Sequence, residues 1–196
     1  MMNRQKVLKT QYSKRVYLSP LGPIVIASNN DCLIGLWFEG QRYIYSTLPT
    51  DLNVVHEDTG DGVLEETSHW LDEYFAGHIQ SLTPKMELIG TDFRKLVWEY
   101  LLTIPYGNTM TYGQIASELG IRSARAVGNA VGHNPISIII PCHRVMGAHN
   151  AITGYAAGID KKEKLLLHER LNAQVIVGGN VGTQNPLEQL TEVNNM

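Results

Sequence analysis

Cys142 and His143 are the neighbouring residues whose types most directly suggest chemistry. They follow three isoleucines at residues 138–140, which predict a buried strand that Pro141 ends because proline cannot donate to a sheet ladder. A thiol at the end of such a strand is shielded from bulk water yet can meet a substrate. Since a neighbouring base or cation lowers the pKa of a thiol from about 8.5, Cys142 beside His143 and Arg144 indicates a nucleophile.

A simpler interpretation of Cys142 is a buried apolar side chain, because free cysteine is among the most buried residue types. A polar turn before the strand, Asn134-Pro135, and acidic residues further along favour chemistry instead. The other cysteine is Cys32, so the chain cannot build a disulfide framework. We therefore expect a reducing compartment, the cytoplasm.

The charge is unevenly distributed along the 196 residues, whose formal net charge is −3. Residues 43–84 hold eight acidic residues and no Lys or Arg, whereas residues 119–159 hold no acidic residue and three arginines, Arg122, Arg125 and Arg144. The C-terminal half therefore carries a local positive field that could support a short phosphate contact surface. No apolar run approaches the about 20 residues of a membrane span, and the N-terminus lacks the apolar core of a signal peptide. We expect neither export nor a membrane partner.

The N-terminal part has the pattern of a small α/β unit. After a polar lead-in to about residue 14, apolar runs at 24–28 and 33–38 flank a turn-forming Asn-Asn-Asp and predict a hairpin. Helical spacing of Trp70, Leu71, Tyr74 and Phe75 then predicts a helix over 65–76, with Gly77 just after its end.

The C-terminal part reads as mostly helical. Thr91 is placed to cap a helix whose apolar face is formed by Phe93, Leu96, Val97, Tyr100 and Leu101. Two short helices follow, over 111–120 and 124–132, the second with Ser123 as its cap. They predict a helix-turn-helix or a simple helical hairpin, and the pattern alone does not separate the two.

The second short helix is composed mainly of alanine, glycine and valine, so most of its side chains are small. Glycines inside a helix cost about 1 kcal/mol each relative to alanine, so close approach of another backbone is the expected compensation. A last helix is expected over 160–170. We therefore predict an N-terminal α/β domain (1–86), a mostly α, winged-helix-like C-terminal domain with a helix-turn-helix (91–171), and a flexible tail (172–196).

The chain contains, in this order, Tyr112, Arg125, Asn134-Pro135, Pro141-Cys142-His143-Arg144, Tyr155 and Glu169. With these residues the sequence closely resembles the 6-O-alkylguanine-DNA alkyltransferases, also called methylated-DNA–protein-cysteine methyltransferases. The resemblance is strong from about 91 to 170 and weak before that.

The resemblance implies repair of double-stranded DNA by irreversible, single-turnover transfer of an alkyl group from 6-O-alkylguanine to Cys142. It implies that His143 removes the thiol proton through a water molecule, that Glu169 holds the imidazole, and that Tyr112 assists departure of the guanine. A soft thiolate suits attack on an alkyl carbon better than an alkoxide does. No cofactor is implied, the protein is expected to act as a monomer, and activity on 4-O-alkylthymine stays an open alternative.

The resemblance also implies that the base is extruded from the duplex, with Arg125 filling the space left in the stack. Small side chains on the second short helix, over 124–132, would let that helix lie close to a narrow DNA groove. The residues expected to contact DNA are Arg125, Tyr112, Ser123, Ala124, Gly128 and Arg144. Those expected to shape the base pocket are Asn134, Val145, Tyr155 and Ala156.

The sequence departs from the family pattern at two positions. Ala157 stands where many relatives have glycine, which affects the expected range of alkyl groups that the pocket accepts. Cys32 has no Cys or His cluster around it to hold the zinc of some relatives.

Two other functions compete with this hypothesis. A DNA-damage sensor would use the helix-turn-helix and leave Cys142 inert, but it would not need His143 or Glu169. A cysteine hydrolase would need an oxyanion hole, for which the sequence shows no signature.

Overall fold

A four-stranded sheet forms the N-terminal part of the protein. The computed structural model describes residues 12–29, 31–48, 55–57, 62–79 and 82–178. The sheet order is β3-β2-β1-β4, and its strands are β1 (Tyr12–Ser19), β2 (Gly22–Asn29), β3 (Cys32–Phe38) and β4 (Val55–Glu57). β2 pairs antiparallel with β1 and with β3, so the predicted hairpin is confirmed, and β4 runs parallel to β1. The expected lead-in is wrong for residues 12–14, because they belong to β1; residues 1–11 lie outside the described part.

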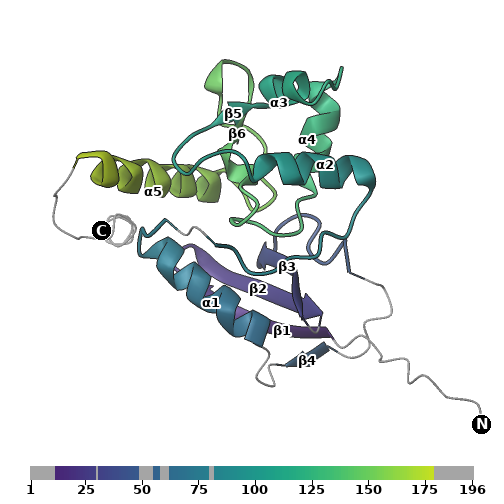
Figure 1. The fold of residues 1–196 in the computed structure, drawn as a ribbon, viewed down its shortest axis with the longest axis vertical. Helices are drawn as coiled ribbons and strands as arrows, with labels where there is room; N and C mark the ends of the chain where they lie inside the picture. Colours follow the sequence, from purple (N-terminus) through teal and green to yellow (C-terminus); the bar gives the residue numbers. More distant parts are fainter. Residues whose placement is uncertain (1–11, 30, 49–54, 58–61, 80–81, 179–196) are drawn as a thin grey trace, which may run out of the picture.

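Helix α1 (Gly62–Phe75) packs against β1, β2 and β3 (Figure 1). From β1, Arg15 pairs with Glu65 at 2.7 Å, and the Tyr17 hydroxyl donates to Asp72 at 2.7 Å. Gly77 follows the helix with φ +88°, the left-handed conformation that glycine adopts easily at a helix end. The predicted helix and its stop signal are confirmed.

The C-terminal part is mostly helical, as predicted, and lies above the sheet in Figure 1. Hydroxyls cap three of its helices: Thr91 caps α2, Thr111 caps α3 with a reciprocal Gln114 contact, and Ser123 caps α4. A parallel pair of two-residue strands, β5 and β6, lies beside these helices. The elements are α2 (Asp92–Leu101), β5 (Met110–Thr111), α3 (Tyr112–Glu118), α4 (Ala124–Gly132), β6 (Val145–Met146) and α5 (Ile159–Gly178).

Two helices differ from their predicted limits or faces. On α2 the buried apolar residues are Val97, Trp98 and Leu101, whereas Phe93 and Leu96 are exposed. Helix α5 continues to Gly178, so the expected flexible tail is wrong for residues 172–178; the remainder of that tail, 179–196, lies outside the described residues. The tail composition is polar, but backbone hydrogen bonds extend the helix because no glycine or proline interrupts it before Gly178.

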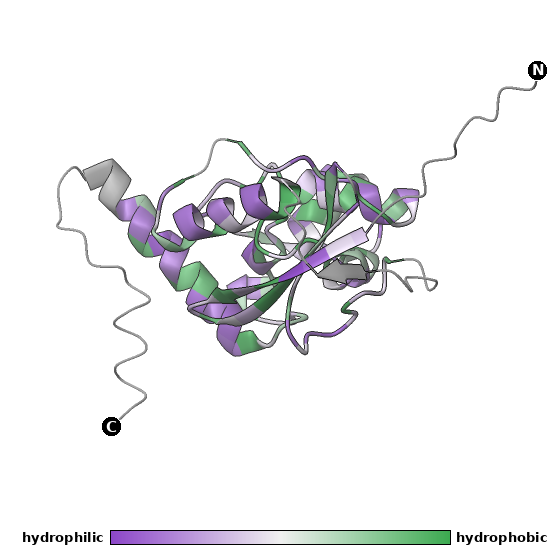
Figure 2. Cartoon of the chain, turned by 90° about the horizontal axis from the view of Figure 1, so that it is seen from below, coloured by the Kyte–Doolittle hydropathy of each residue, from purple (hydrophilic) through white to green (hydrophobic). Residues whose placement is uncertain are grey.

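One contiguous apolar core joins the two parts of the chain. It includes Ile26 and Leu36 of the sheet together with Trp98 of α2 and Leu165 of α5. Figure 2 shows hydrophobic and hydrophilic residues alternating around the helices, as expected when each helix buries one face. Within the described residues, no helix has both the length and the apolar character needed to cross a membrane. The shared core fixes the C-terminal helices against the sheet.

Candidate active site

Cys142 begins a one-turn 3-10 helix, Cys142–Arg144, at the end of a buried loop. The predicted strand over 138–140 is wrong, although these isoleucines are buried as expected. Ile138 has a left-handed backbone conformation (φ 71°), and the Ile140 N–H donates to the Ile136 carbonyl at 3.0 Å. The run therefore closes on itself as a compact turn instead of pairing along a sheet.

Asn134 holds this turn together from inside. Its Nδ2 atom lies 2.8 Å from the carbonyl oxygen of Ile140 and 3.0 Å from Sγ of Cys142. Its Oδ1 accepts a hydrogen bond from the Ile136 N–H at 3.0 Å. An amide donor at the sulfur stabilises the thiolate form, so Asn134 both braces the loop and favours ionisation of Cys142.

His143 is buried and contacts Glu169 through an Nε2–Oε1 distance of 2.7 Å. Since a carboxylate can only accept, Nε2 carries the shared proton and Nδ1 of the neutral ring is an acceptor. Nδ1 is buried and has no hydrogen-bond partner among the described residues. Burial lowers the pKa of His143, although Glu169 opposes that shift. The neutral imidazole can therefore take up one proton at Nδ1.

Arg144 lies on the same carboxylate rather than on an open surface. Its Nε and Nη2 donate to Glu169 at 2.8 and 3.0 Å, and its Nη1 donates to the Ile104 carbonyl at 2.6 Å. The side chain is 12% exposed, so the structure does not support the predicted DNA contact of Arg144. The long-range partner Glu169, which the local sequence cannot reveal, draws it inward.

Glu169 is the hub of this buried network. It also accepts hydrogen bonds from the Tyr74 hydroxyl at 3.0 Å and from the Gly107 N–H at 3.1 Å. Burial alone would raise the pKa of Glu169, but His143 and Arg144 outweigh it and hold that pKa well below its usual range. A permanent carboxylate at this point fixes the tautomer and orientation of His143.

The surroundings of Cys142 favour the protonated thiol. Burial raises the pKa of Cys142 above its ordinary value, while the Asn134 hydrogen bond and the positive charge of Lys162 act in the opposite direction. The side chain is 5% exposed. Formation of a thiolate therefore needs a base, and the next residue, His143, has an unpartnered acceptor at Nδ1.

Lys162 is a buried cation near the thiol that the sequence did not reveal. It lies in α5, is completely buried, and its Nζ donates to the carbonyls of Val145 and Thr153. Burial lowers its pKa to about 8, with Cys142 opposing the shift. Lysine is almost never fully buried, so the helical pattern gave no signal for this position. Its charge favours the thiolate form of Cys142.

A pocket of about 240 Å³ opens onto Cys142. Of the predicted residues, Tyr112, Gly128, Tyr155 and Ala156 line it with Cys142. The predicted pocket residues Asn134 and Val145 are buried and do not line it. Asn134 contacts Cys142 from inside the protein, and the Val145 carbonyl accepts a hydrogen bond from Lys162. The remaining lining residues are Arg42, Tyr43, Asn129, Val131, Gly132, His133 and Gly154.

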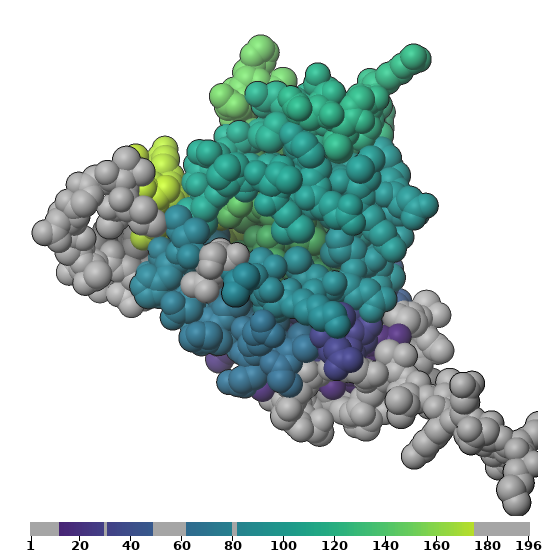
Figure 3. All heavy atoms as spheres, in the orientation of Figure 1, coloured from purple at the N-terminus to yellow at the C-terminus, as the bar shows by residue number. Residues whose placement is uncertain are grey.

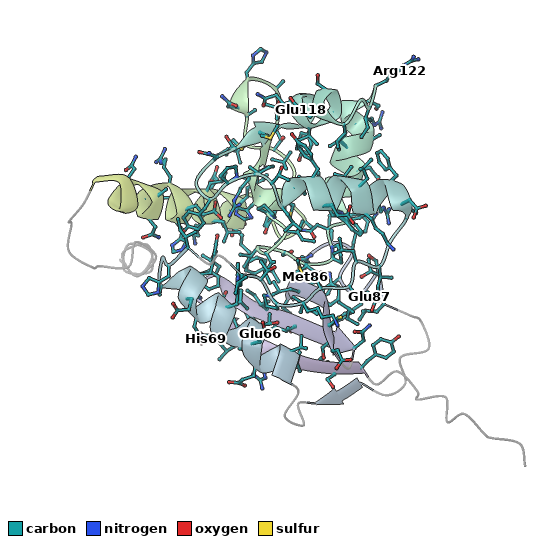
Figure 4. The ribbon with its side chains drawn as sticks, viewed as in Figure 1. Glu66, His69, Met86, Glu87, Glu118 and Arg122 are labelled. Atoms are coloured by element: carbon teal, nitrogen blue, oxygen red, sulfur yellow. The ribbon has the colours of Figure 1, made fainter. Side chains whose placement is uncertain are left out.

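A second hollow continues from this pocket along α3 and α4. It shares Tyr112, Gly128 and Asn129 with the pocket and is also lined by Ala124 and Arg125. Figure 3 shows that these helices form an end of the molecule remote from the sheet, and Figure 4 shows Arg122 projecting from their connection. The predicted surface residues Ser123, Ala124 and Arg125 are all exposed here.

The two glycines of α4 are not required by contacts within the protein. A Cβ added at Gly132 would meet nothing within 4 Å, and one at Gly128 would meet the Tyr112 ring at an ordinary 3.7 Å. An internal neighbour therefore does not explain these glycines. They leave an open helix face that another molecule can approach closely.

Two family models match this chain. The DNA-binding domain of 6-O-methylguanine DNA methyltransferase matches residues 92–171, and the ribonuclease-like domain of the same enzyme matches residues 13–88. The methylated-DNA–protein-cysteine methyltransferase of Mycobacterium tuberculosis is 43% identical over 156 residues, covering 79% of this chain and 90% of that protein. This chain belongs to the 6-O-methylguanine DNA methyltransferase family.

Further methyltransferases agree in sequence and in fold. The protein of the same name from Methanosarcina acetivorans is 44% identical over 153 residues, covering 77% of this chain and 94% of its own length. The crystal structure of Mycobacterium tuberculosis OGT in complex with DNA has a TM-score of 0.71 and 40% identity, covering 83% of this chain and 94% of that one.

As a member of this methyltransferase family, the chain brings most of its predicted residues to one place. His143 and Glu169 form a buried hydrogen-bonded pair, while Cys142, Tyr112, Tyr155 and Ala156 line the pocket. The sequence did not identify Lys162, His133, or the Arg42–Tyr43 turn of the N-terminal part as neighbours of the thiol. Folding brings these residues together over long sequence distances, so no local sequence pattern predicts their contacts. Among the described residues, no group of three or more His, Cys, Asp or Glu side chains could hold a metal ion.

Proposed function

We propose that this protein repairs DNA by transferring the alkyl group of 6-O-alkylguanine to Cys142, once per molecule. The observation that carries the proposal is a buried thiol that forms part of an open pocket and lies next to a neutral histidine fixed by a permanent carboxylate. Its relatives named methylated-DNA–protein-cysteine methyltransferase support the same reaction.

The reaction begins with loss of the Cys142 proton. Nδ1 of His143 is the acceptor, by way of a water molecule as the family resemblance implies, and Glu169 stabilises the resulting imidazolium. Asn134 and Lys162 stabilise the sulfur anion. The thiolate attacks the alkyl carbon, so a C–S bond forms, the C–O bond breaks, and its electron pair stays on the guanine oxygen.

The leaving guanine must gain a proton to depart as a neutral base, and a hydrogen bond to a ring nitrogen assists that step. Tyr112 lines the pocket, and burial raises the pKa of its hydroxyl, which keeps it a donor at neutral pH. We assign it this role at a purine nitrogen. Because the thioether on Cys142 is stable and the site offers no route to reverse it, each molecule acts once.

A guanine stacked in duplex DNA cannot reach Cys142, so the proposal includes extrusion of the nucleotide. The α3–α4 face supports this step: Arg125 is exposed on it, and Gly128 gives close access along α4. Arg125 then occupies the space left in the base stack. Crystallisation of a Mycobacterium tuberculosis relative with DNA supports a DNA partner.

The partner is double-stranded DNA containing an alkylated guanine, bound by a monomer acting in the cytoplasm. The damage-sensor alternative is weaker because it gives no purpose to the buried contact between His143 and Glu169. The hydrolase alternative lacks a path for clearing an acyl-enzyme.

Transfer of a labelled methyl group from duplex DNA to protein tests the proposal. The native protein should acquire the label, whereas Cys142→Ser should bind the same duplex and acquire none. Label on the Cys142→Ser protein would exclude Cys142 as the acceptor. Binding without any transfer by the native protein would favour the sensor.

A further inference from the structure

The Arg42–Tyr43 turn brings the N-terminal part of the chain to the pocket of Cys142. It follows β3 and supplies two of the residues that line the same cavity as Cys142, Tyr112 and Tyr155. Neither the proposed alkyl transfer nor the proposed extrusion uses it. Its position raises the question of what it contacts when a nucleotide enters the pocket.

Three contacts fasten this turn to the C-terminal part. The buried Gln41 accepts a hydrogen bond from the Ser137 hydroxyl at 3.2 Å, and the Arg42 N–H donates to the Ala156 carbonyl at 3.0 Å. The Tyr43 ring stacks on His133, with 3.9 Å between ring centroids and an interplanar angle of 23°. The turn is therefore built into the pocket wall rather than left as a free loop.

The backbone of the turn is held in an uncommon conformation. Tyr43 and Tyr45 have φ values of 62° and 61°, a region that residues with bulky side chains rarely adopt. The Tyr45 ring meets Trp37 edge-on at 5.4 Å, and Tyr43 is held by His133. Such strain persists only where surrounding contacts enforce it, and it is concentrated at functional sites.

Arg42 gives this wall a positive charge. Its side chain is exposed, and no carboxylate pairs with it within the part of the chain that the structure describes. The planar guanidinium matches the oxygens of a phosphate or a carboxylate and binds either with two parallel hydrogen bonds. Since the pocket is to receive an extruded nucleotide, the anion present in every substrate is a backbone phosphate beside it.

We propose that the Arg42–Tyr43 turn is a nucleotide-binding element in which Arg42 binds a phosphate flanking the extruded guanine. The stack of Tyr43 on His133 positions the turn, and the Arg42–Ala156 hydrogen bond couples it to the pocket-lining residues 154–156. This inference rests on the proposed function. It assigns to the N-terminal part a direct contact with the substrate.

The first test measures binding of a duplex containing 6-O-methylguanine in the Cys142→Ser background, with and without Arg42→Gln. The matched control is Lys85→Gln, which removes one exposed positive charge outside this pocket. Arg42→Gln should weaken binding roughly tenfold, as expected for a charged hydrogen-bonded contact. It should also reduce the slope of log affinity against log salt by about 0.9, the value for one phosphate contact. Lys85→Gln should do neither.

The second test separates a phosphate contact from other roles of Arg42. In proteins with Cys142 intact, Arg42→Gln should slow single-turnover transfer from the duplex far more than reaction with the free base 6-O-benzylguanine, since the free base has no phosphate. Equal slowing of both reactions, or an unchanged salt slope, would overturn the phosphate assignment. An effect confined to 6-O-carboxymethylguanine, absent for 6-O-methylguanine, would assign the anion to the adduct and would also overturn it.

Tyr43 variants test the positioning role. Tyr43→Phe keeps a ring stacked on His133 and should bind the duplex with native affinity. Tyr43→Ala should weaken duplex affinity as much as Arg42→Gln does. Equal affinity for Tyr43→Ala would refute positioning by the stack. If the native protein transfers no methyl group from any duplex, the proposed function fails, and that result is distinct from a failure of Arg42→Gln to change binding.

Discussion

Replacing Glu169 with glutamine should damage both the stability of the fold and the reaction. Glutamine keeps the size of the side chain but removes the negative charge and turns one acceptor atom into a donor. In the native protein both carboxylate oxygens face donors: Oε1 accepts from His143, Tyr74 and Arg144, and Oε2 accepts from Arg144 and Gly107. Either orientation of the amide therefore places its NH₂ group against an N–H or O–H donor.

The expected cost follows from the buried charge of Arg144. Removing one partner of a buried ion pair typically costs about 3–5 kcal/mol. Arg144 keeps its hydrogen bond to the Ile104 carbonyl, so we expect the lower end, about 3 kcal/mol of unfolding free energy. We also expect transfer to slow by about a hundredfold, within the usual range for general acid–base catalysis, because His143 loses the group that orients it and stabilises its charged form.

The pH dependence gives the sign of the effect. Folding lowers the pKa of Glu169, so the stability it contributes is complete above about pH 4.3, the ordinary value for glutamate, and is lost as the pH falls further. The difference between native protein and Glu169→Gln should therefore be largest at neutral pH and shrink below pH 4.

Urea unfolding followed by circular dichroism, together with rapid-quench transfer kinetics, measures both effects. Glu66→Gln is the matched control, because Glu66 is an exposed carboxylate on the outer face of α1 (Figure 4). It should stay within about 0.5 kcal/mol of the native protein. A Glu169→Gln protein with native stability and an unchanged pH–rate profile would refute the assigned network.

Three further variants test other parts of the site. Lys162→Met should raise the pKa of Cys142, slow transfer at neutral pH by about tenfold and shift the pH–rate curve to higher pH, since one pKa unit changes the thiolate fraction tenfold. An unshifted curve would show that the charge of Lys162 does not act on the thiol. Because folding lowers the pKa of Lys162 to about 8, the unfolded chain binds more protons above that pH, and this residue's contribution should make native stability rise between pH 8 and 10, an effect absent from Lys162→Met in urea unfolding. Gly132→Ala should stabilise the fold by up to about 1 kcal/mol yet slow repair of duplex DNA, and repair at the native rate would show that this face needs no close approach. Arg125→Ala should slow transfer from duplex DNA far more than reaction with free 6-O-benzylguanine, and an equal loss in both assays would contradict its role in extrusion.

Local signals in the sequence were sufficient for several elements. Thr91 and Ser123 cap α2 and α4 as predicted, because an N-cap depends on residues within one helical turn. The same holds for the hairpin of β2 and β3 and for Gly77 at the end of α1. Strand β1 escaped notice, since its charged Lys14 and Arg15 interrupt the apolar pattern that marks a strand.

Long-range contacts account for what sequence reasoning missed. The isoleucines at 138–140 have strand-like composition, yet the side chain of Asn134 bonds to the backbone within this loop and a compact turn forms. Arg144 and Lys162 are long cations that normally lie on the surface, and partners distant in sequence bury them here. The proposed catalytic pair of Cys142 and His143 was recognisable because the two residues are contiguous, whereas Glu169 was assigned by family resemblance.

The most direct test of alkyl transfer to Cys142 is the intact mass of the protein after incubation with excess duplex DNA containing 6-O-methylguanine, followed by peptide mapping. We expect the mass to increase by one methyl group, the increase to stop at one per molecule, and the modification to map to Cys142. An unchanged mass despite binding of the duplex, or a methyl group on any other residue, would contradict it.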